Sequence, residues 1–300
     1  IGCMNETGTR QRADNISGLL GEKEMASYLY SQPKEKLSGY FIQIGIDDFG
    51  IINNVQGQIY GNYILKRVAE CIAECLSSGQ RIYHLVTDKY MLVDMLSKSQ
   101  DDVVQLFKRI GEKIDEFIVD ENYKSIFSIS AGVTDISTLA EDAIECRKKS
   151  DFSLKCAKKR GGGSLYFFEE EDYKVSLRKN TILSALRSAT VNDFEGFEVY
   201  YQPILDSADR IIGAEALLRF CMHSDEGDEM ISPVEFIPLL EKSRLIIPVG
   251  EFVLNEAAKM CREMQQYIAD FRVNINVSYI QIMRGSMANK ILSAIQANNL

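Results

Sequence analysis

The sequence predicts an α/β chain in two parts: a mixed sheet packed with helices, followed by the start of a (β/α)8, TIM-like barrel. Its 300 residues fit two domains of about 150 residues each. Apolar strand-like runs alternate with helix-like periodicity along the chain. In the second half, polar residues stand where strands end, as in (β/α) barrels, where chemistry sits at the carboxyl ends of strands.

The first half alternates strands and helices in the order expected of helices on a mixed sheet. Strands are predicted at 40–46 and 125–133, a hairpin at 81–95, and helices at 59–76, 103–118 and 140–159. A glycine run at 161–163 leads into a strand-like run at 164–168. An acidic stretch follows, so we predict two domains, residues 14–172 and 173–300.

The second half repeats the alternation with fewer strands. Strands are predicted at 198–205, 211–220 and 271–277, and helices at 175–188, 233–243, 250–269 and 288–296. Polar residues stand at the strand ends: Gln202, Glu215, Arg219, Asn274, Asn276 and Ser278. Three strands do not close an eight-stranded barrel, so we expect this segment to come from a longer protein.

The composition is 46% hydrophobic and 26% charged, with no apolar run near the ~18–20 residues of a membrane-spanning helix. A net charge of −9 argues against nucleic acid polymers as partners. Seven cysteines without a CxxC pair and only two histidines, His84 and His223, exclude a zinc ribbon and a histidine-rich metal site. We expect a cytoplasmic location, including as part of a larger, membrane-anchored protein.

Several blocks of the first half resemble GGDEF (diguanylate cyclase) domains. Asp14–Leu19 resembles the DxLTGL opening of that family, and Phe49–Leu65 follows its F-K-x-x-N-D…G…G-D…L spacing. Ser130–Gly132 resembles its S-x-G strand, and Asp151–Lys158 its closing helix. The resemblance covers residues 14–170 and implies a GGDEF-type α+β sheet. Such domains condense two GTP molecules across a dimer with two Mg²⁺ ions.

The GGDEF signature loop is degenerate here and reads Val86-Thr87-Asp88-Lys89-Tyr90. By the resemblance, Lys89 replaces a metal-binding glutamate and Gly45 replaces an aspartate of the first strand. Each lost charge is worth roughly 4 kcal/mol at ~4 Å and an effective dielectric near 20, times the ion's double charge. We therefore expect no cyclase activity and a regulatory or dimerising role within a homodimer.

A vestigial nucleotide site remains a second interpretation of this half. The resemblance would form it from Asp47, Asn53, Asn54 and Lys158. Lys89 could then stand in for Mg²⁺ and bind the phosphates of GTP with help from Lys158. The alternative, which we favour, is that Lys89 is a solvated lysine of a turn.

The second half resembles an EAL domain, from a family that hydrolyses cyclic di-GMP. Tyr201–Ile204 (YQPI) and Gly213–Arg219 (GAEALLR) carry the resemblance, with collinear blocks at 231–238 and 273–278. It implies that Glu215 and Asn276 bind Mg²⁺ or Mn²⁺. It also implies that Arg219, Gln202 and Leu217 contact the cyclic dinucleotide. For Glu215 alone, a solvated residue at the rim of a strand is the plainer alternative.

Together these motifs indicate the GGDEF–EAL portion of a bacterial cyclic di-GMP signalling protein. In a complete parent we expect hydrolysis of cyclic di-GMP to linear pGpG. The remaining EAL site residues would lie past Leu300, so we expect no turnover by this segment. The alternative is a non-catalytic scaffold that senses nucleotide or binds other proteins.

Overall fold

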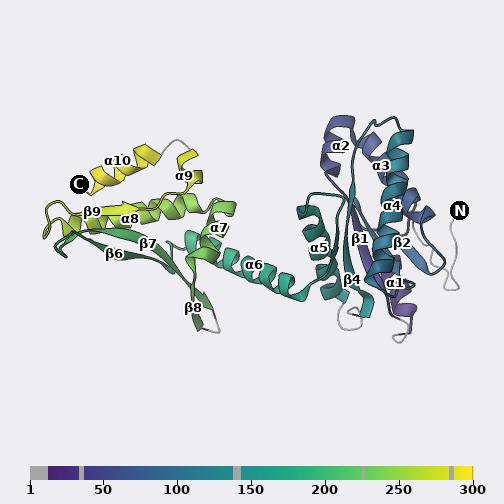
Figure 1. The fold of residues 1–300 in the computed structure, drawn as a ribbon, viewed down its shortest axis with the longest axis horizontal. Coiled ribbons are helices and arrows are strands. Elements are labelled where there is room, and N and C mark those ends of the chain that lie inside the picture. Colours follow the sequence, from purple (N-terminus) through teal and green to yellow (C-terminus); the bar gives the residue numbers. More distant parts are fainter. Residues whose placement is uncertain (1–12, 34–36, 138–142, 225–226, 284–286, 299) are drawn as a thin grey trace. The chain divides into compact units, whose positions relative to one another are not determined.

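The computed structural model describes residues 13–33, 37–137, 143–224, 227–283, 287–298 and 300 (Figure 1). The chain divides into two compact units, residues 1–173 and 174–300, and each is described by itself. Among the described helices, none has the length and apolarity needed to span a membrane.

The first unit is a five-stranded mixed sheet with helices on both faces (Figure 1), as the sequence predicts. Its strands are β1 (Tyr40–Ile46), β2 (Gln80–His84), β3 (Lys89–Asp94), β4 (Ile129–Asp135) and β5 (Leu165–Phe167). The order is β2-β3-β1-β4-β5, antiparallel except for the β4–β5 pair. Its helices are α1 (Glu22–Ser31), α2 (Phe49–Gln56), α3 (Gln58–Glu74), α4 (Gln100–Asp120) and α5 (Ala143–Lys159).

Strand β1 is central, and its side chains alternate between two cores. Ile42, Ile44 and Ile46 join the core formed with α3 and α4, while Phe41 joins a second core with α1 and α5. A strand covered on both faces needs apolar residues at nearly every position, which explains the run YFIQIGI. The exception, Gln43, is fully buried and lies on the α5 face.

Helix α5 approaches β4 closely because Gly132 has no side chain. A Cβ atom built on Gly132 would lie 2.1 Å from the backbone nitrogen of Leu154. The glycine of the Ser130–Gly132 block is therefore a packing requirement, and it brings the C-terminal half of α5 against the end of β1.

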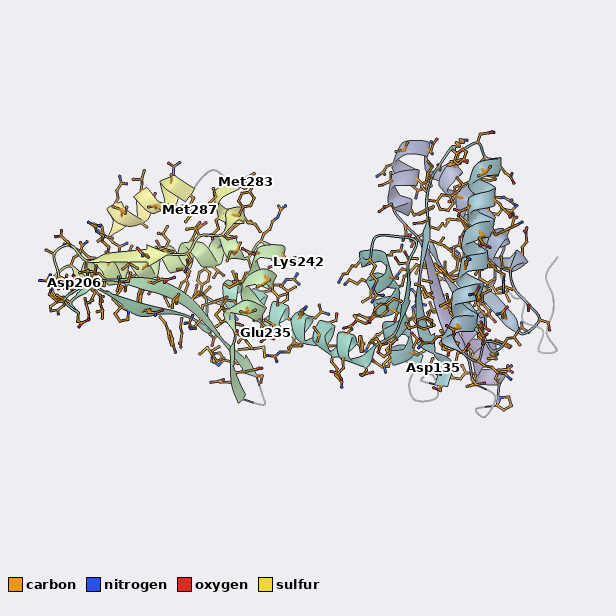
Figure 2. All side chains as sticks on the ribbon, in the orientation of Figure 1. Asp135, Asp206, Glu235, Lys242, Met283 and Met287 are labelled. Atoms are coloured by element: carbon orange, nitrogen blue, oxygen red, sulfur yellow. The ribbon has the colours of Figure 1, made fainter. Side chains whose placement is uncertain are left out.

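The second unit is built around one long strand, β7 (Ile211–Ser224). Strand β6 (Phe197–Leu205) pairs antiparallel with one edge of β7. The hairpin partner β8 (Gly227–Ile231) and the parallel strand β9 (Arg272–Ile275) pair with different stretches of β7. The β6–β7 turn is closed by Asp206, labelled in Figure 2, whose carboxylate accepts hydrogen bonds from the amides of Ala208 (2.8 Å) and Arg210 (3.0 Å).

Helices cover one face of this second sheet. They are α6 (Glu170–Val191, mostly in this unit), α7 (Pro233–Ser243), α8 (Ile246–Met264), α9 (Tyr279–Met283) and α10 (Met287–Ala297). Phe197, Phe220 and Ile231 are buried against residues of α6, α7 and α8. The side chains of the opposite face are half-buried or exposed, and this is the face that carries the candidate site.

Several elements differ from the sequence expectations. Strand β8 was not predicted because only its last residue, Ile231, is buried, so its sequence shows no alternation. Helices α1, α2 and α9 were also missed, and each is ten residues or shorter. Helix α8 starts four residues earlier than predicted and ends at Met264. The start of the predicted 140–159 helix lies outside the described residues.

The glycine contacts generate a paired prediction on stability. Replacing Gly132 by alanine should lower the free energy of unfolding by about 3 kcal/mol or more, because the new Cβ meets backbone at 2.1 Å. The control is Gly111→Ala within α4, where nothing lies within 4 Å of the added Cβ. This second change should raise stability by about 0.5–1 kcal/mol through helix propensity. Urea unfolding of both variants measures the difference, and equal effects would contradict the packing argument.

Candidate functional site

The predicted EAL residues of β6 and β7 lie on one face of the sheet. Directly paired residues of antiparallel strands share a face, and successive residues alternate. Gln202 pairs with Glu215 in the β6–β7 register, and Leu217 and Arg219 follow Glu215 at intervals of two. The intervening Ala214, Ala216 and Phe220 are buried on the helix-covered face. Alternation therefore presents Gln202, Glu215, Leu217 and Arg219 together.

Glu215 and Asn276 are in direct contact although they are 61 positions apart. The Asn276 Nδ2 group donates a hydrogen bond of 2.7 Å to Glu215 Oε1. Asn276 follows β9 directly, and the parallel β7–β9 register pairs Glu215 with Asn274. The contact places the Glu215 carboxylate beside the Asn276 amide group, and carboxylate and amide oxygens are the hard donors that Mg²⁺ and Mn²⁺ prefer. The side chains thus fit a divalent cation.

Arg219 is a half-buried cation on the same face. Its Nη1 donates to the Leu218 carbonyl oxygen at 2.9 Å, and its guanidinium carbon lies 5.5 Å from the centroid of the Tyr200 ring. Within the described part of the chain, no carboxylate lies within ion-pair distance of Arg219. Its charge is therefore available to an anion. Tyr200 was not predicted, although its position two residues before Gln202 places it on this face.

In the first unit, the degenerate loop joins β2 to β3. Thr87 has a φ of 55°, the left-handed region that glycine adopts freely and a β-branched residue adopts with strain. Val86 is exposed, while Tyr90 is fully buried and donates a hydrogen bond of 2.7 Å to the Leu65 carbonyl. Thr87 therefore adopts a backbone conformation that favours glycine, although the loop has no glycine at this position.

Lys158 lies beside the position of the missing strand aspartate. Its Nζ donates to the Ile46 carbonyl at 2.7 Å and to Asp88 Oδ2 at 3.0 Å. A Cβ atom built on Gly45 would lie 3.0 Å from the same Nζ. An ammonium at ~4 Å from a divalent cation would repel it by roughly 8 kcal/mol at an effective dielectric near 20. These residues do not fit a divalent metal.

Lys89 is also held by a carboxylate. Its Nζ lies 2.9 Å from Asp151 Oδ1, which accepts a second hydrogen bond from Gln43 at 2.7 Å. Arg147 Nε reaches the other oxygen at 3.2 Å. Burial tends to raise the pKa of Asp151, but the hydrogen bonds from Gln43 and Lys89 and the charge of Arg147 outweigh it and lower that pKa. Lys89 is therefore part of an ion-pair network rather than a solvated lysine.

The other predicted residues of the vestigial nucleotide site do not form one cluster. Asp47 accepts hydrogen bonds from Ser128 Oγ (2.6 Å), Ser130 Oγ (2.8 Å) and the Gly163 amide (2.9 Å). Asn53 and Asn54 lie on α2. In the described part of the chain, no hydrogen bond links either asparagine to Asp47 or Lys158.

Comparison with known families agrees with the geometry of both units. Residues 14–164 match the family described as diguanylate cyclase, GGDEF domain. Residues 184–300 match the EAL domain family. The chain therefore belongs to the family of proteins that join a GGDEF domain to an EAL domain. Both resemblances drawn from the sequence motifs are confirmed.

Named relatives align with most of this chain and are longer than it. The bifunctional diguanylate cyclase/cyclic di-GMP phosphodiesterase MucR of Pseudomonas aeruginosa is 27% identical over 260 residues, covering 85% of this chain and 37% of that protein. The cyclic di-GMP phosphodiesterase PdeB of Shewanella oneidensis is 24% identical over 272 residues, covering 90% and 31%. This chain thus spans about a third of these relatives' length.

Among the solved structures that align over both units is a portion of a Vibrio cholerae protein. It is the S helix–GGDEF–EAL portion of Vibrio cholerae LapD bound to c-di-GMP. The alignment covers 96% of this chain and 65% of that chain, with 15% identity and a TM-score of 0.48.

The Asp151 network generates a pH-dependent prediction. A carboxyl with a lowered pKa contributes stability above its unfolded pKa, and that contribution disappears as the pH falls through the folded pKa. Asp151→Asn should therefore lower the free energy of unfolding by about 1 kcal/mol at pH 7. The difference in free energy of unfolding between Asp151→Asn and the unsubstituted chain should shrink as the pH falls below the pKa of an unperturbed aspartate.

The control is Asp120→Asn, at the exposed C-terminal end of α4, which should leave stability nearly unchanged at both pH values. Urea unfolding at pH 7 and at acid pH provides the measurement. A difference for Asp151→Asn that grows with acidity would contradict the ion-pair network.

Proposed function

We propose that the second unit is a cyclic di-GMP-binding EAL module, which in a complete parent protein hydrolyses cyclic di-GMP to linear pGpG with Mg²⁺ or Mn²⁺. The observation that carries the proposal is the 2.7 Å contact between Glu215 and Asn276. It lies on an exposed sheet face that also presents Arg219, which has no ion-pair partner among the described residues. Membership of the GGDEF–EAL family and the names of the relatives support the choice of ligand.

Four side chains on this face have distinct proposed roles toward the dinucleotide. Arg219 binds a phosphate of the dinucleotide, and Tyr200 holds the guanidinium by stacking beneath it. Gln202 donates and accepts hydrogen bonds to the ligand, and Leu217 offers an apolar contact to a guanine ring.

Glu215 and Asn276 would hold the divalent cation. In a two-metal phosphodiesterase the cations supply an activated hydroxide and neutralise the leaving oxygen. Two cations need several carboxylates, whereas this pair brings one carboxylate and one amide oxygen. We therefore propose that residues 1–300 by themselves bind cyclic di-GMP without turning it over.

For the first unit we propose a regulatory role, with dimerisation of the chain through this domain, and no cyclase activity. The absence of cyclase activity is supported by the Lys158 ammonium, which lies beside Gly45 and at 2.7 Å from the Ile46 carbonyl. GTP binding by Lys89 and Lys158 is the competing proposal, and the pairing of both ammonium groups with Asp151 and Asp88 disfavours it. A non-catalytic scaffold remains the alternative for the whole chain.

The first test of the second unit is calorimetric titration of cyclic di-GMP into the chain with Mn²⁺ present. We expect saturable heat without turnover. Sustained heat flow after each injection would show catalysis and contradict the proposed separation of binding from turnover. No heat at all would show that this face is not a ligand site and would favour the scaffold.

Variants identify the residues that bind. Arg219→Ala should weaken cyclic di-GMP about 10- to 100-fold, because a charged hydrogen bond contributes about 1.5–3 kcal/mol. Glu215→Gln should weaken binding only when Mn²⁺ is present. Matched controls at exposed positions of α8, Arg262→Ala and Glu263→Gln, should bind normally. If the controls and the site variants weaken binding equally, the proposed face is wrong.

The competing GTP proposal has its own measurement. If the ion pairs neutralise both lysines, the chain should show no saturable GTP binding, and Lys89→Ala should change nothing. GTP affinity that is lost in Lys89→Ala would instead establish a nucleotide site in the first unit.

A further inference from the structure

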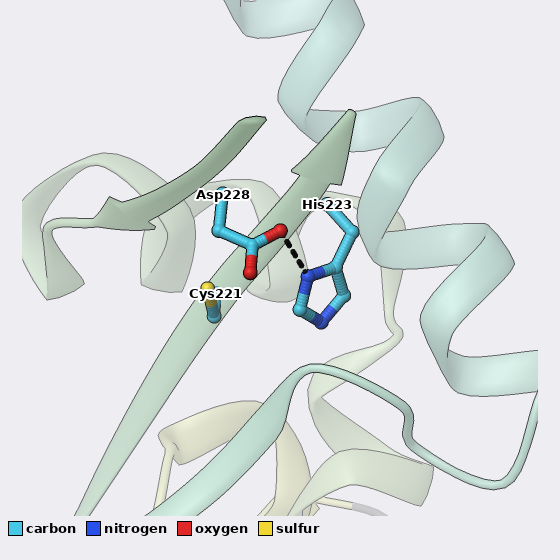
Figure 3. A group of neighbouring side chains, drawn as sticks. All are labelled: Cys221, His223 and Asp228. Carbon is cyan, nitrogen blue, oxygen red and sulfur yellow. Dashed lines mark hydrogen bonds and ion pairs between the residues drawn. The ribbon is translucent and has the colours of Figure 1, made fainter. Parts of the chain in front are cut away.

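A second group of ligating side chains lies at the far end of β7, on the hairpin that β7 forms with β8. Cys221 and His223 are two residues apart on β7, and Asp228 of β8 pairs directly with His223. Their Sγ, imidazole nitrogen and carboxylate oxygen all lie within 4.8 Å of one another (Figure 3). Cys221 is six residues along β7 from Glu215, about 20 Å at 3.3 Å per residue, so the group is distant from the proposed divalent-cation position. It is only two residues, about 7 Å, from Arg219 on the same strand face, and it uses none of the residues proposed to contact cyclic di-GMP.

The hairpin holds these three side chains on regular backbone. Its register runs from Phe220 paired with Ile231 to Ser224 paired with Gly227. Phe220 and Ile231 are fully buried and anchor the base, and Ser224 Oγ donates to the Gly227 carbonyl at 2.8 Å near the turn. Donors placed by paired strands keep their spacing better than donors on a loop.

A simple ion pair accounts for two of the three residues. His223 Nδ1 lies 2.6 Å from Asp228 Oδ1, and this hydrogen bond and charge raise the pKa of His223. It does not account for the half-buried Cys221 thiol, which faces both groups. Within the described part of the chain, no hydrogen bond to this thiol is formed. A metal ion would give the thiol a partner and use the imidazole and carboxylate that already converge on it.

The donor set selects the class of metal. Thiolate, imidazole and carboxylate together suit borderline divalent ions such as Zn²⁺, which binds four ligands tetrahedrally. Mg²⁺ and Ca²⁺ prefer sets of oxygen atoms. We propose that Cys221, His223 and Asp228 form a Zn²⁺-type site with three protein ligands and one position left for water. Binding would release the thiol proton to solvent.

A metal ion bound by Cys221, His223 and Asp228 would link β8 to β7 and restrict the motion of the start of α7. Arg178 of α6 bridges Glu229 of β8 (2.7 Å) and Glu235 of α7 (2.9 Å; Glu235 is labelled in Figure 2). The next residue after β8 precedes α7 directly. A metal that holds β8 in place would therefore also restrict α6 and α7, which Arg178 connects to β8. This makes the site a candidate input for a transition-metal signal in the second unit.

The test is titration of Co²⁺ into the reduced, metal-free chain, followed by absorption spectroscopy. Tetrahedral Co²⁺ bound to a thiolate gives visible d–d bands and a near-ultraviolet sulfur-to-metal band. We expect both to saturate at one equivalent, to vanish on adding Zn²⁺, and to persist in millimolar Mg²⁺. The last result separates this site from the hard-donor site at Glu215 and Asn276.

Variants assign the bands to this hairpin. Cys221→Ser should remove the sulfur band. His223→Gln and Asp228→Asn should each weaken Co²⁺ at least about tenfold, since losing even an outer partner of a ligand typically costs 10–100-fold. The control is Cys75→Ser on the first unit, where the side chain donates to the Arg109 carbonyl and serine can do the same. It should leave the titration unchanged.

Two results would overturn the proposal: no sulfur band in the unsubstituted chain, or a sulfur band that survives Cys221→Ser. His223 and Asp228 are exposed, at 51% and 66% of their side chains, so their variants should fold even if Cys221→Ser does not. Circular dichroism of the metal-free variants checks that folding. Cyclic di-GMP binding is measured separately, so failure of one proposal leaves the other intact.

Discussion

The backbone ladder of β7 is the constraint on which the second unit depends. One strand pairs with β6, β8 and β9, so its alternation sets the orientation of nearly every residue discussed for this unit. Ala214, Ala216 and Phe220 face the helices, and Glu215, Leu217 and Arg219 therefore face the other side. A one-residue slip in register would bury the charged set and expose the apolar one. Burial of Ala214, Ala216 and Phe220 therefore determines which way the polar residues of the site point.

The first unit shows how a GGDEF-type fold can form around a degenerate signature loop. The sheet depends on apolar alternation in β1 and on the close approach at Gly132, and neither involves the residues that have changed. In the signature region the lysines do not remain as free positive charges. Lys158 pairs with Asp88 and the Ile46 carbonyl, and Lys89 pairs with Asp151. Nearby carboxylates therefore neutralise both lysines, which is consistent with a regulatory role for this domain.

The elements and site residues that could be predicted from the sequence are those marked by apolar periodicity or by family motifs. Strand β1 and helix α7 have the predicted bounds, because a buried run and a serine–proline start are strong local signals. Strand β8 was missed because Gly227–Met230 is exposed and its sequence therefore shows no apolar alternation. The same limit applies at the sites. The Glu215–Asn276 pair follows from a motif, whereas the partners of Lys89 depend on where α5 crosses β1, which no local pattern specifies.

The Cys221, His223 and Asp228 group illustrates that limit most clearly. Counting residues excluded a histidine-rich metal site, and the count is correct, but it tests only sites built from many histidines or from CxxC pairs. A cross-strand site needs one residue of each kind, and its spacing of two and five in sequence becomes a triangle only when the hairpin register pairs His223 with Asp228. Because β8 carries no apolar signal, that register could not be read from the sequence. The two proposed sites therefore present different donors, oxygen at Glu215 of β7 and sulfur, nitrogen and oxygen at Cys221, His223 and Asp228. Mg²⁺ should therefore bind poorly at Cys221, His223 and Asp228, since it prefers sets of oxygen ligands.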